Sequence, residues 1–425
     1  MKIYLDNSAT TKVYPEVAEA MRQAMTETYA NPSSLHKAGQ EAERLMKLAR
    51  QQISFAINSK PASIIFTSGG SESNNMALRS AYNAQAREKK KAIAVSSVEH
   101  PSVSITAGHI KGPDSNIFMI PVRRSGENGP GAVDVTAFRQ LLDDQLALVA
   151  VMHVNNEIGT IQPIDEISRL LNNHINYRDI DIPLHVDAVQ SFGKIPIDVA
   201  SGDLRRAAYI SMSAHKIGGP KGSGALFAAN PARVRPLIYG GGQEGGLRSG
   251  TENIPGIVGL SVAARIATSD YLGHANAVER CRATLLAGIK SEIGDILINS
   301  PEKASVRGEP YLCSPYILNV SFLGTKGEVV LHELERSGIY VSTGSACSSN
   351  MKPGKDKMTT LRAIGLKPEA EEGAVRFSFS PENNVRQMEF VIDRLKKAVD
   401  RFRRIDPAGK RNAQTKPAGG PVPEK

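Results

Sequence analysis

The sequence predicts an α/β fold in which a large domain, built on a mainly parallel sheet flanked by helices, is joined to a smaller α+β domain. Short apolar runs of strand length recur through the first two thirds of the 425 residues and alternate with stretches of helical spacing. From about residue 263 onward, longer helices are interleaved with a few strands. We therefore expect a large domain at residues 15–262 and a small domain made of residues 1–14 and 263–404.

The strands expected in the large domain are continuously apolar, as in a sheet that is covered on both faces. They are SIIFT (63–67), AIAVSS (92–97), LALVAVMHV (146–154), IPLHVDAV (182–189), AAYISMSA (207–214) and GALFAA (224–229). Helical spacing is found in IDEISRLLNN after residue 163 and at Ala42, Leu45, Met46, Ala49, Ile53 and Ile57. Ligands of such sheets bind beyond the carboxyl ends of the strands, so a functional site is expected in the loops that follow them.

The small domain is predicted from a longer helical stretch, SVAARIATSDYLGHANAVERCRATLLAGIKSEI, and from ILNVSF and VRFSFS as strands. Cys281 lies in the helical stretch and Cys313 lies beside a strand. Both are expected to be small buried hydrophobic residues. Three cysteines are too few for a disulfide framework or a paired zinc motif, so no metal site is expected.

The net charge of +9 is concentrated near the end of the chain, because residues 401–425 hold seven Lys or Arg and only two acids. The body is not strongly basic, so no direct contact with nucleic acid is expected. Residues 405–425 are rich in Pro, Gly and Lys and are predicted to be a disordered basic tail. No apolar run approaches the roughly 18 residues of a membrane span and no signal peptide is evident, which predicts a cytoplasmic protein.

Polar side chains follow the predicted strands at the edge where ligands bind. SIIFT leads into Gly69, Gly70 and Ser71 at the start of a helix, where free N–H groups and the helix dipole suit a phosphate. An ordinary helix cap is the alternative at that stretch. The ends of the other strands carry His100, Asn155, Asn156, Asp187, Gln190, Ser213, His215 and Lys216.

A single cofactor, pyridoxal phosphate, uses this set of groups. It needs a lysine amine for a Schiff base, a carboxylate that keeps the pyridine nitrogen protonated, and a cup of small residues for its phosphate. Lys216 and Asp187 can supply the amine and the carboxylate. The cup can be formed by Gly70, Ser71, Ser213 and His215.

Nucleotide binding is the competing interpretation of the glycine-rich stretches. A P-loop is excluded because no GxxxxGK[ST] surrounds Lys216. A GxGxxG pattern occurs at Gly240, Gly242 and Gly245, but it does not open a clear helix, so a dinucleotide site is disfavoured.

These motifs resemble, in family order, those of the cysteine desulfurases in the class V aminotransferase group, close to the NifS/IscS-like subgroup. They are LDNSATT, NPSSLH, TSGGSESNN, EHPSV, HVNNEIGTIQP, HVDAVQSFGKIPID, SAHKIGGPKGSGAL, GGGQEGGLRSGTEN, STGSACSS and VRFSFS, between about residues 3 and 400. The resemblance implies a PLP-dependent transferase fold of type I, pyridoxal 5'-phosphate as cofactor and L-cysteine as substrate. Four positions depart from the family pattern: Gly70 and Ser71 stand where the family usually has Ala and Thr, Gly218 replaces a bulkier residue, and Gly245 replaces a common arginine.

The resemblance implies roles for residues around the cofactor ring. Lys216 would hold the cofactor covalently, Asp187 would pair with the ring nitrogen, and Gln190 would bond the ring hydroxyl. His100 would stack on the ring and Asn156 would also line the cofactor.

The resemblance also implies how the phosphate and the substrate are bound. Asn31 and Arg376, with Asn156, would bind the substrate, Arg376 by a bidentate pair with its carboxylate. Thr251 would reach the phosphate from the neighbouring subunit of a homodimer. The other phosphate ligands would be Gly70, Ser71, Ser213 and His215.

Cys347 lies among small residues, STGSACSS, which are typical of a mobile loop rather than a rigid element. In the family's chemistry, L-cysteine displaces Lys216 from the cofactor and Lys216 removes the α-proton. The thiolate of Cys347 then takes the substrate sulfur as a persulfide, and alanine is released. An unperturbed thiol has a pKa of about 8.5, so either the site favours deprotonation or a neighbouring base assists, and His100 is one candidate for that base.

Alternatives to a desulfurase are a selenocysteine lyase or another PLP-dependent lyase or transaminase of the same fold, and a non-catalytic module that binds an acidic partner through its basic tail. Cys347 argues against a transaminase. The sulfur acceptor is left open between an iron-sulfur scaffold protein and a relay for thiolation of tRNA or of another cofactor.

Overall fold

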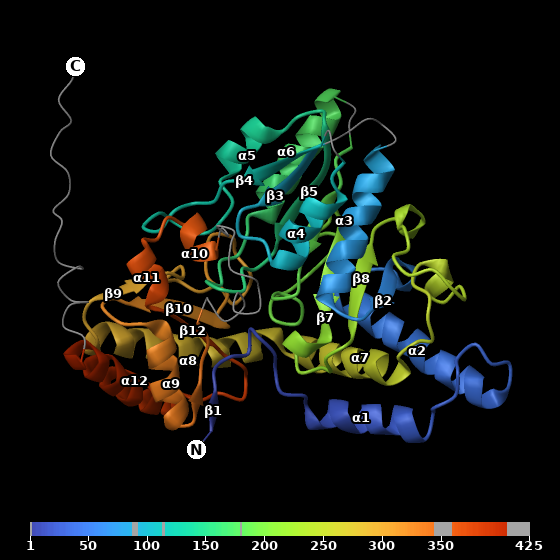
Figure 1. The fold of residues 1–425 in the computed structure, drawn as a ribbon. Coiled ribbons are helices and arrows are strands. Elements are labelled where there is room, and N and C mark those ends of the chain that lie inside the picture. The colour runs from blue at the N-terminus through green and yellow to red at the C-terminus, as the bar shows by residue number, and fades with distance from the viewer. Residues whose placement is uncertain (1, 87–91, 113–114, 179–180, 344–358, 406–425) are drawn as a thin grey trace.

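The computed structural model describes residues 2–86, 92–112, 115–178, 181–343 and 359–405, which form two parts lying side by side (Figure 1). The larger part contains a seven-stranded sheet with the order β2-β8-β7-β6-β5-β3-β4. Six of these strands run in the same direction, and β8 runs antiparallel to them. The strands are β2 (Ile64–Thr67), β3 (Ala92–Ser96), β4 (Asn116–Ile120), β5 (Leu146–Met152), β6 (Leu184–Asp187), β7 (Ala207–Ser213) and β8 (Gly224–Ala228).

The six apolar runs of the large domain are thus confirmed as strands of a mainly parallel sheet. The carboxyl ends of β3, β5, β6 and β7 lie at one edge because these strands pair in parallel. β4 is a strand that the apolar pattern misses. It lies at the end of the sheet and its side chains are mostly exposed or half-buried, although residues 117–120 are all apolar.

Helices cover both faces of this sheet, and the side chains of β5 show why the strand is apolar throughout. Val149 and Val151 join the cluster formed with α2, α6 and α7, whereas Leu148 and Ala150 join the cluster formed with α3 and α4. The helices of this part are α1 (Pro15–Thr26), α2 (Lys37–Ala56), α3 (Gly70–Ala86), α4 (Pro101–Ile110), α5 (Val135–Leu141), α6 (Ile164–Arg178) and α7 (Ile254–Ser269). Short 3₁₀ turns span Pro61–Ser63, Ala214–Lys216, Pro231–Arg233 and Glu244–Gly246.

The smaller part is an α+β unit around a three-stranded antiparallel sheet with the order β12-β10-β9. Its strands are β9 (Ile296–Ile298), β10 (Ile317–Phe322) and β12 (Ala374–Ser378). The amphipathic helix α12 (Val385–Ile405) packs Met388, Val391, Leu395 and Val399 into its core. The other helices are α8 (Tyr271–Glu292), α9 (Gly327–Arg336), α10 (Thr360–Ala363) and α11 (Pro368–Glu372).

The first residues of the chain belong to this smaller part. β1 (Ile3–Tyr4) pairs in parallel with β11 (Ile339–Tyr340). Ile3 and Leu5 lie in the same hydrophobic cluster as the three-stranded sheet. The chain then runs between the two parts into α1 (Figure 1).

The long helical stretch after residue 261 differs from its prediction, because it forms two helices. Asp270 has non-helical dihedral angles and ends α7, and its side chain accepts a hydrogen bond from the N–H of Gly273 to cap α8. α7 packs into the large cluster as far as Ala267, and the second cluster begins at Ala275. The domain division at residues 15–262 and 263–404 stays a prediction.

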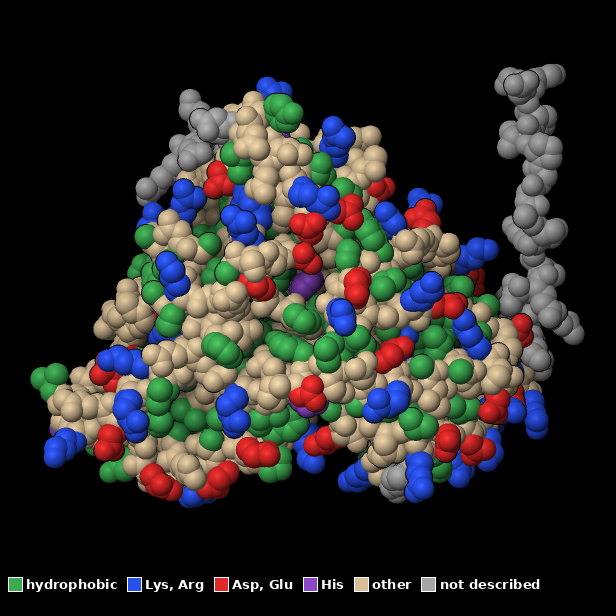
Figure 2. Space-filling model, turned by 180° about the vertical axis from the view of Figure 1, so that it is seen from behind, with side chains coloured by type: hydrophobic (Ala, Val, Ile, Leu, Met, Phe, Trp, Pro, Cys, Tyr) green, Lys and Arg blue, Asp and Glu red, His purple; other side chains and the backbone are tan. Residues whose placement is uncertain are grey.

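Charges of both signs are interspersed over the face of the molecule seen in Figure 2. The predicted basic tail lies almost entirely outside the described residues. None of the helices that the structure describes has the length and apolar composition needed to cross a membrane.

Candidate active site

A cavity of about 280 Å³ lies at the edge of the sheet where the parallel strands end. The structure brings together most of the residues that the sequence assigned to a site, from both parts of the molecule. Those that line the cavity are Gly70, Ser71, His100, Asn156, Asp187, Gln190, Ser213, His215, Lys216 and Arg376.

Two of the predicted residues that the structure describes are not brought to this cavity. Asn31 and Thr251 are exposed and are not among its lining residues. The Asn31 side chain accepts a hydrogen bond from the N–H of Ser33 instead. Cys347 lies outside the described residues.

Lys216 ends the 3₁₀ turn that follows β7, so its position is set directly by that strand. Its ammonium group donates to the carbonyl oxygens of Ser8 at 2.6 Å and Ala9 at 2.8 Å. The N-terminal segment therefore holds the amine at the wall of the cavity. Lys216 and Asp187 open onto the same cavity, as the predicted chemistry requires.

Asp187 is the last residue of β6 and is 5% exposed. The sequence required a cation or a strong donor for this buried carboxylate, and the structure supplies donors. Oδ2 accepts from Nδ2 of Asn74 at 2.7 Å, and Oδ1 accepts from the N–H of Val189 at 3.0 Å. Asn74 was not predicted. The sequence pattern that could have indicated Asn74 is its spacing of four residues from Gly70, because this spacing places both residues on one face of α3.

The N-terminus of α3 is shaped for a phosphate. The first-turn N–H groups of a helix have no intrahelical acceptors and lie at the positive end of its dipole. A Cβ on Gly70 would lie 2.5 Å from Cγ2 of Val189, so a larger residue here would require Val189 to shift. Ser213 and His215 line the same cavity.

His215 contributes a neutral imidazole to this region. Burial, together with the positive charges of Lys216, Lys221 and Lys194, lowers the pKa of His215 to about 4. Nδ1 lies 3.2 Å from Oγ1 of Thr10. A neutral ring can donate one N–H to an anion without titrating near neutral pH.

His100 is linked to Asp187 through two residues that the sequence analysis missed. Its Nδ1 accepts from the N–H of Ser102 at 3.1 Å and lies 2.7 Å from Oγ of Ser102. That oxygen in turn accepts from Nδ2 of Asn74 at 2.8 Å. Because Nδ1 is an acceptor here, the neutral imidazole carries its proton on Nε2.

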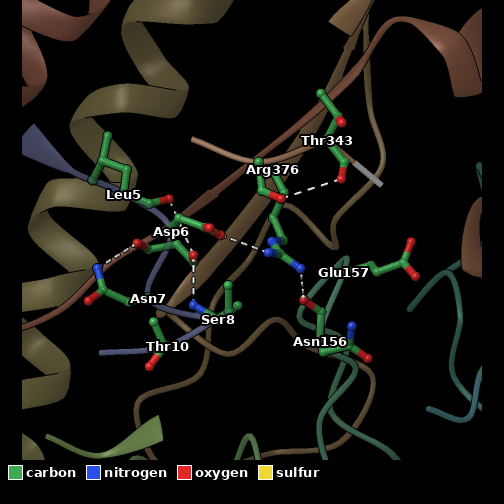
Figure 3. A network of polar contacts seen from close by, with 12 residues as sticks. Leu5, Asp6, Asn7, Ser8, Thr10, Asn156, Glu157, Thr343 and Arg376 are labelled. Carbon is green, nitrogen blue, oxygen red and sulfur yellow. Dashed lines mark hydrogen bonds and ion pairs between the residues drawn. The ribbon is translucent and has the colours of Figure 1, made fainter. Parts of the chain in front are cut away.

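Arg376 lies on β12 and is held by both parts of the molecule (Figure 3). Nη2 pairs with Oδ1 of Asp6 at 2.8 Å, and Nη1 donates to the carbonyl oxygen of Asn156 at 3.1 Å. Arg376 is 4% exposed, and its Nε has no hydrogen-bond partner among the described residues. A guanidinium with a buried free N–H at a cavity wall suits a carboxylate ligand. The role of Asp6 was missed, although it lies in the LDNSATT motif.

The donor set fits pyridoxal phosphate. An amine, a buried carboxylate and a helix N-terminus around one cavity can hold an aldehyde, a pyridine nitrogen and a phosphate, respectively. The described part of the chain contains no group of three or more His, Cys, Asp or Glu placed to hold a metal ion. Cys281 and Cys313 are buried, as predicted for structural cysteines.

The chain is similar in sequence and fold to several known proteins. Residues 3–391 match the family described as aminotransferase class-V. Cysteine desulfurase IscS of Clostridium botulinum is 36% identical over 406 residues, which cover 96% of each chain. A solved structure of a NifS-like protein is similar with a TM-score of 0.82 and 32% identity, over 94% of this chain and 100% of that chain.

A solved structure of SspA in complex with cysteine is also similar, with a TM-score of 0.73 and 32% identity, over 90% of this chain and 99% of that chain. These similarities confirm the resemblance found in the motifs. Because the family match spans nearly the whole chain and includes every described residue that lines the cavity, the protein belongs to the aminotransferase class-V family.

Proposed function

We propose that this protein is a PLP-dependent cysteine desulfurase that removes sulfur from L-cysteine and releases L-alanine. One structural observation carries the proposal: Lys216, Asp187 and Arg376 line the same cavity of about 280 Å³. The 36% identity to a cysteine desulfurase over nearly the full chain supports the reaction. The similarity to SspA in complex with cysteine supports the substrate. A selenocysteine lyase or a transaminase is not favoured by these relatives.

The chain's own residues would hold the cofactor as follows. The amine of Lys216 binds it covalently, and Asp187 holds the proton on its ring nitrogen. When bound, pyridoxal phosphate supplies an electron sink for the bonds at the substrate Cα. Gln190 and His100 bind and cover the ring. The N–H groups of Gly70 and Ser71, with Ser213 and His215, bind the phosphate.

Arg376 and Asn156 would orient the substrate. The free Nε–H and the Nη2 group of Arg376 lie on one edge of the guanidinium, where a carboxylate can bind with two hydrogen bonds. Asp6 already occupies Nη2, so it holds the guanidinium in place before the substrate arrives. Asn31 is proposed to complete this subsite. Lys216, once free of the cofactor, is positioned to take the proton from Cα.

Cys347 is proposed as the residue that accepts the sulfur. Its thiolate forms an S–S bond with the substrate sulfur while the C–S bond breaks and its electron pair stays with the carbon skeleton. The products are a persulfide on Cys347 and, after protonation at carbon, alanine. His100 is proposed as the base that generates the thiolate.

We infer a homodimer in which Thr251 of one subunit contributes to the phosphate site of the other, since Thr251 is exposed in the single chain. The persulfide must pass to a sulfur acceptor. An iron-sulfur scaffold protein or a thiolation relay is proposed, and a persulfide transfer assay against each distinguishes them. The cytoplasmic location stays a prediction.

Two variants test the proposed function. Lys216→Ala is expected to abolish the visible absorption band that the wild type forms with pyridoxal phosphate, because the covalent link is lost. Cys347→Ala is expected to keep the band but to release alanine from L-cysteine more than about a hundredfold more slowly.

Cys281→Ala is the matched control, since Cys281 is buried in α8 and lines no part of the cavity. It is expected to release alanine at the wild-type rate. A Cys347→Ala enzyme that releases alanine at the wild-type rate would show that another group accepts the sulfur. A wild type with no visible band would refute the cofactor assignment itself.

A further inference from the structure

A buried lysine that the proposed chemistry does not use lies next to the site. Lys194 is in the turn after β6 and is 5% exposed. Among the described residues no carboxylate forms an ion pair with it, and its ammonium donates to Oε1 of Gln190 at 3.0 Å. Its Nζ also lies 5.6 Å from the ring centroid of Tyr316. A buried ammonium without an acid is costly, so its retention calls for an explanation.

The ammonium determines which end of the Gln190 amide faces which neighbour. An ammonium group has only donors, so it can bond the amide oxygen and never the amide nitrogen. The nitrogen is thereby turned to the carbonyl oxygen of Ser8, to which it donates at 3.0 Å. The same carbonyl accepts from Lys216 at 2.6 Å. If the amide were flipped, its NH2 group would face the ammonium of Lys194 and its oxygen would face the carbonyl oxygen of Ser8. Neither hydrogen bond could then form.

We propose that Lys194 is a positioning residue that locks the amide of Gln190 so that it presents N–H donors, and not its oxygen, to the cofactor cavity. Gln190 lines that cavity, whereas Lys194 is not among its lining residues. Lys194 is connected to the cavity by its hydrogen bond to Gln190. The inference rests on the proposed function, in which Gln190 faces the ring hydroxyl. An N–H donor stabilises the ionised form of that oxygen, whereas an amide oxygen would repel it.

The electrostatics of the region agree with this role. Burial, together with the positive charges of Lys216 and Arg376, lowers the pKa of Lys194 to about 7. An apolar side chain of similar length would avoid this penalty. The fold instead retains a donor at the one place where the amide oxygen needs one.

The experiment is a spectroscopic pH titration of the holoenzyme, in which the midpoint of the change in the visible absorption band is measured. Lys194→Met is expected to raise this midpoint by about one pH unit, which corresponds to the loss of one hydrogen bond to a charged group. Lys194→Arg keeps a donor-only side chain and is expected to restore much of the wild-type midpoint. Lys12→Met is the matched control and is expected to keep the wild-type midpoint. Lys12 and Lys194 line the same neighbouring cavity of about 560 Å³, but the side chain of Lys12 is 74% exposed.

A double-mutant comparison separates a relay through Gln190 from a direct effect of charge. In a Gln190→Leu background, adding Lys194→Met is expected to leave the midpoint unchanged, because the amide through which Lys194 acts is gone. The proposal is overturned if Lys194→Met alone leaves the midpoint at the wild-type value, or if the shift persists in the Gln190→Leu background. Should Lys194→Met alone fail to fold, the comparison in the Gln190→Leu background decides: a shift of the midpoint there overturns the proposal. A wild type without a visible band would instead refute the proposed function.

Discussion

At the scale of single residues, the site depends on side chains that support the reacting groups without being among them. Asn74 is 1% exposed and its Nδ2 group donates both to Asp187 and to Ser102. It therefore orients the carboxylate and, through Ser102, the ring of His100. An amide can do both because its two N–H donors diverge.

Asn74→Ala is expected to weaken the binding of pyridoxal phosphate about tenfold, because a hydrogen bond to a charged carboxylate contributes about 1.5 kcal/mol or more. Titration of the visible absorption band measures the dissociation constant. Asn83→Ala, an exposed position on the same helix, is the control and is expected to bind as the wild type does. Equal affinities in the two variants would show that Asn74 does not support Asp187.

At the scale of elements, the loop after β8 is fixed to the large domain by an ion pair that the motif comparison did not anticipate. Both carboxylate oxygens of Glu244 bind the guanidinium of Arg50, one of them at 2.9 Å to Nη1, and Oε2 also accepts from the N–H of Phe66 at 2.8 Å. The Glu244 side chain is 3% exposed. The next residue, Gly245, has a φ of 65°, a left-handed conformation that glycine adopts at little cost. This loop is thus anchored at the position where the family's common arginine is absent.

Glu244→Ala is expected to lower the free energy of unfolding by about 3 kcal/mol, because it leaves the partly buried Arg50 guanidinium without its acid and Phe66 without an acceptor. Urea unfolding followed by circular dichroism measures the change. Glu302→Ala breaks an ion pair with Lys290 in which both side chains are about half exposed, and it is expected to change stability by less than about 1 kcal/mol. Similar losses in both variants would contradict the anchoring role of Glu244.

At the scale of the whole molecule, the N-terminal segment connects the smaller part to the site. β1 is paired with β11, Asp6 is paired with Arg376, and the carbonyl oxygens of Ser8 and Ala9 accept from Lys216. Residues from the two ends of the chain therefore meet at one cavity. The geometry of the site therefore depends on the packing of the smaller part as well as on the large sheet.

Two buried neutral histidines, His185 in β6 and His153 directly after β5, make stability depend on pH. Burial lowers the pKa of His153 to about 4 and that of His185 to about 3, against about 6.5 in an unfolded chain. Between these values the unfolded chain binds more protons than the folded one. Stability is therefore retained above about pH 6.5 and is lost as the pH falls toward 4, by up to about 1.4 kcal/mol per pH unit for each histidine.

His185→Gln is expected to reduce the loss of melting temperature between pH 6.5 and pH 5, whatever its effect on the melting temperature at pH 7. Differential scanning calorimetry at several pH values measures the slope. His332→Gln, on the exposed surface of α9, is the control and is expected to keep the wild-type slope. A His185→Gln slope equal to that of the wild type would show that this histidine is not a source of the acid sensitivity.

The sequence by itself determined the class of fold and six of the seven strands of the large sheet, and it predicted that Lys216 and Asp187 lie at one cavity. It could do so because buried strands are read from local apolar runs, and because Asp187 and Lys216 lie at the carboxyl ends of such runs. The division of the long stretch after residue 261 was missed, since Asp270 differs only slightly from other polar residues in a helical pattern until its capping bond is seen.

Only the tertiary structure decided how the reacting groups are held. Asn74 and Asp187 are 113 residues apart, and Asp6 and Arg376 are 370 residues apart, so neither pair leaves a local signal. A Cβ on Gly218, where the family has a bulkier residue, would lie 2.1 Å from Cε2 of Tyr14, which shows that the ring of a distant residue fills that space. In a sequence, a polar side chain on a helix or in a turn has the same pattern whether it faces solvent or a buried carboxylate. The difference arises from desolvation, which exists only once the sheet and its two layers of helices have closed around it.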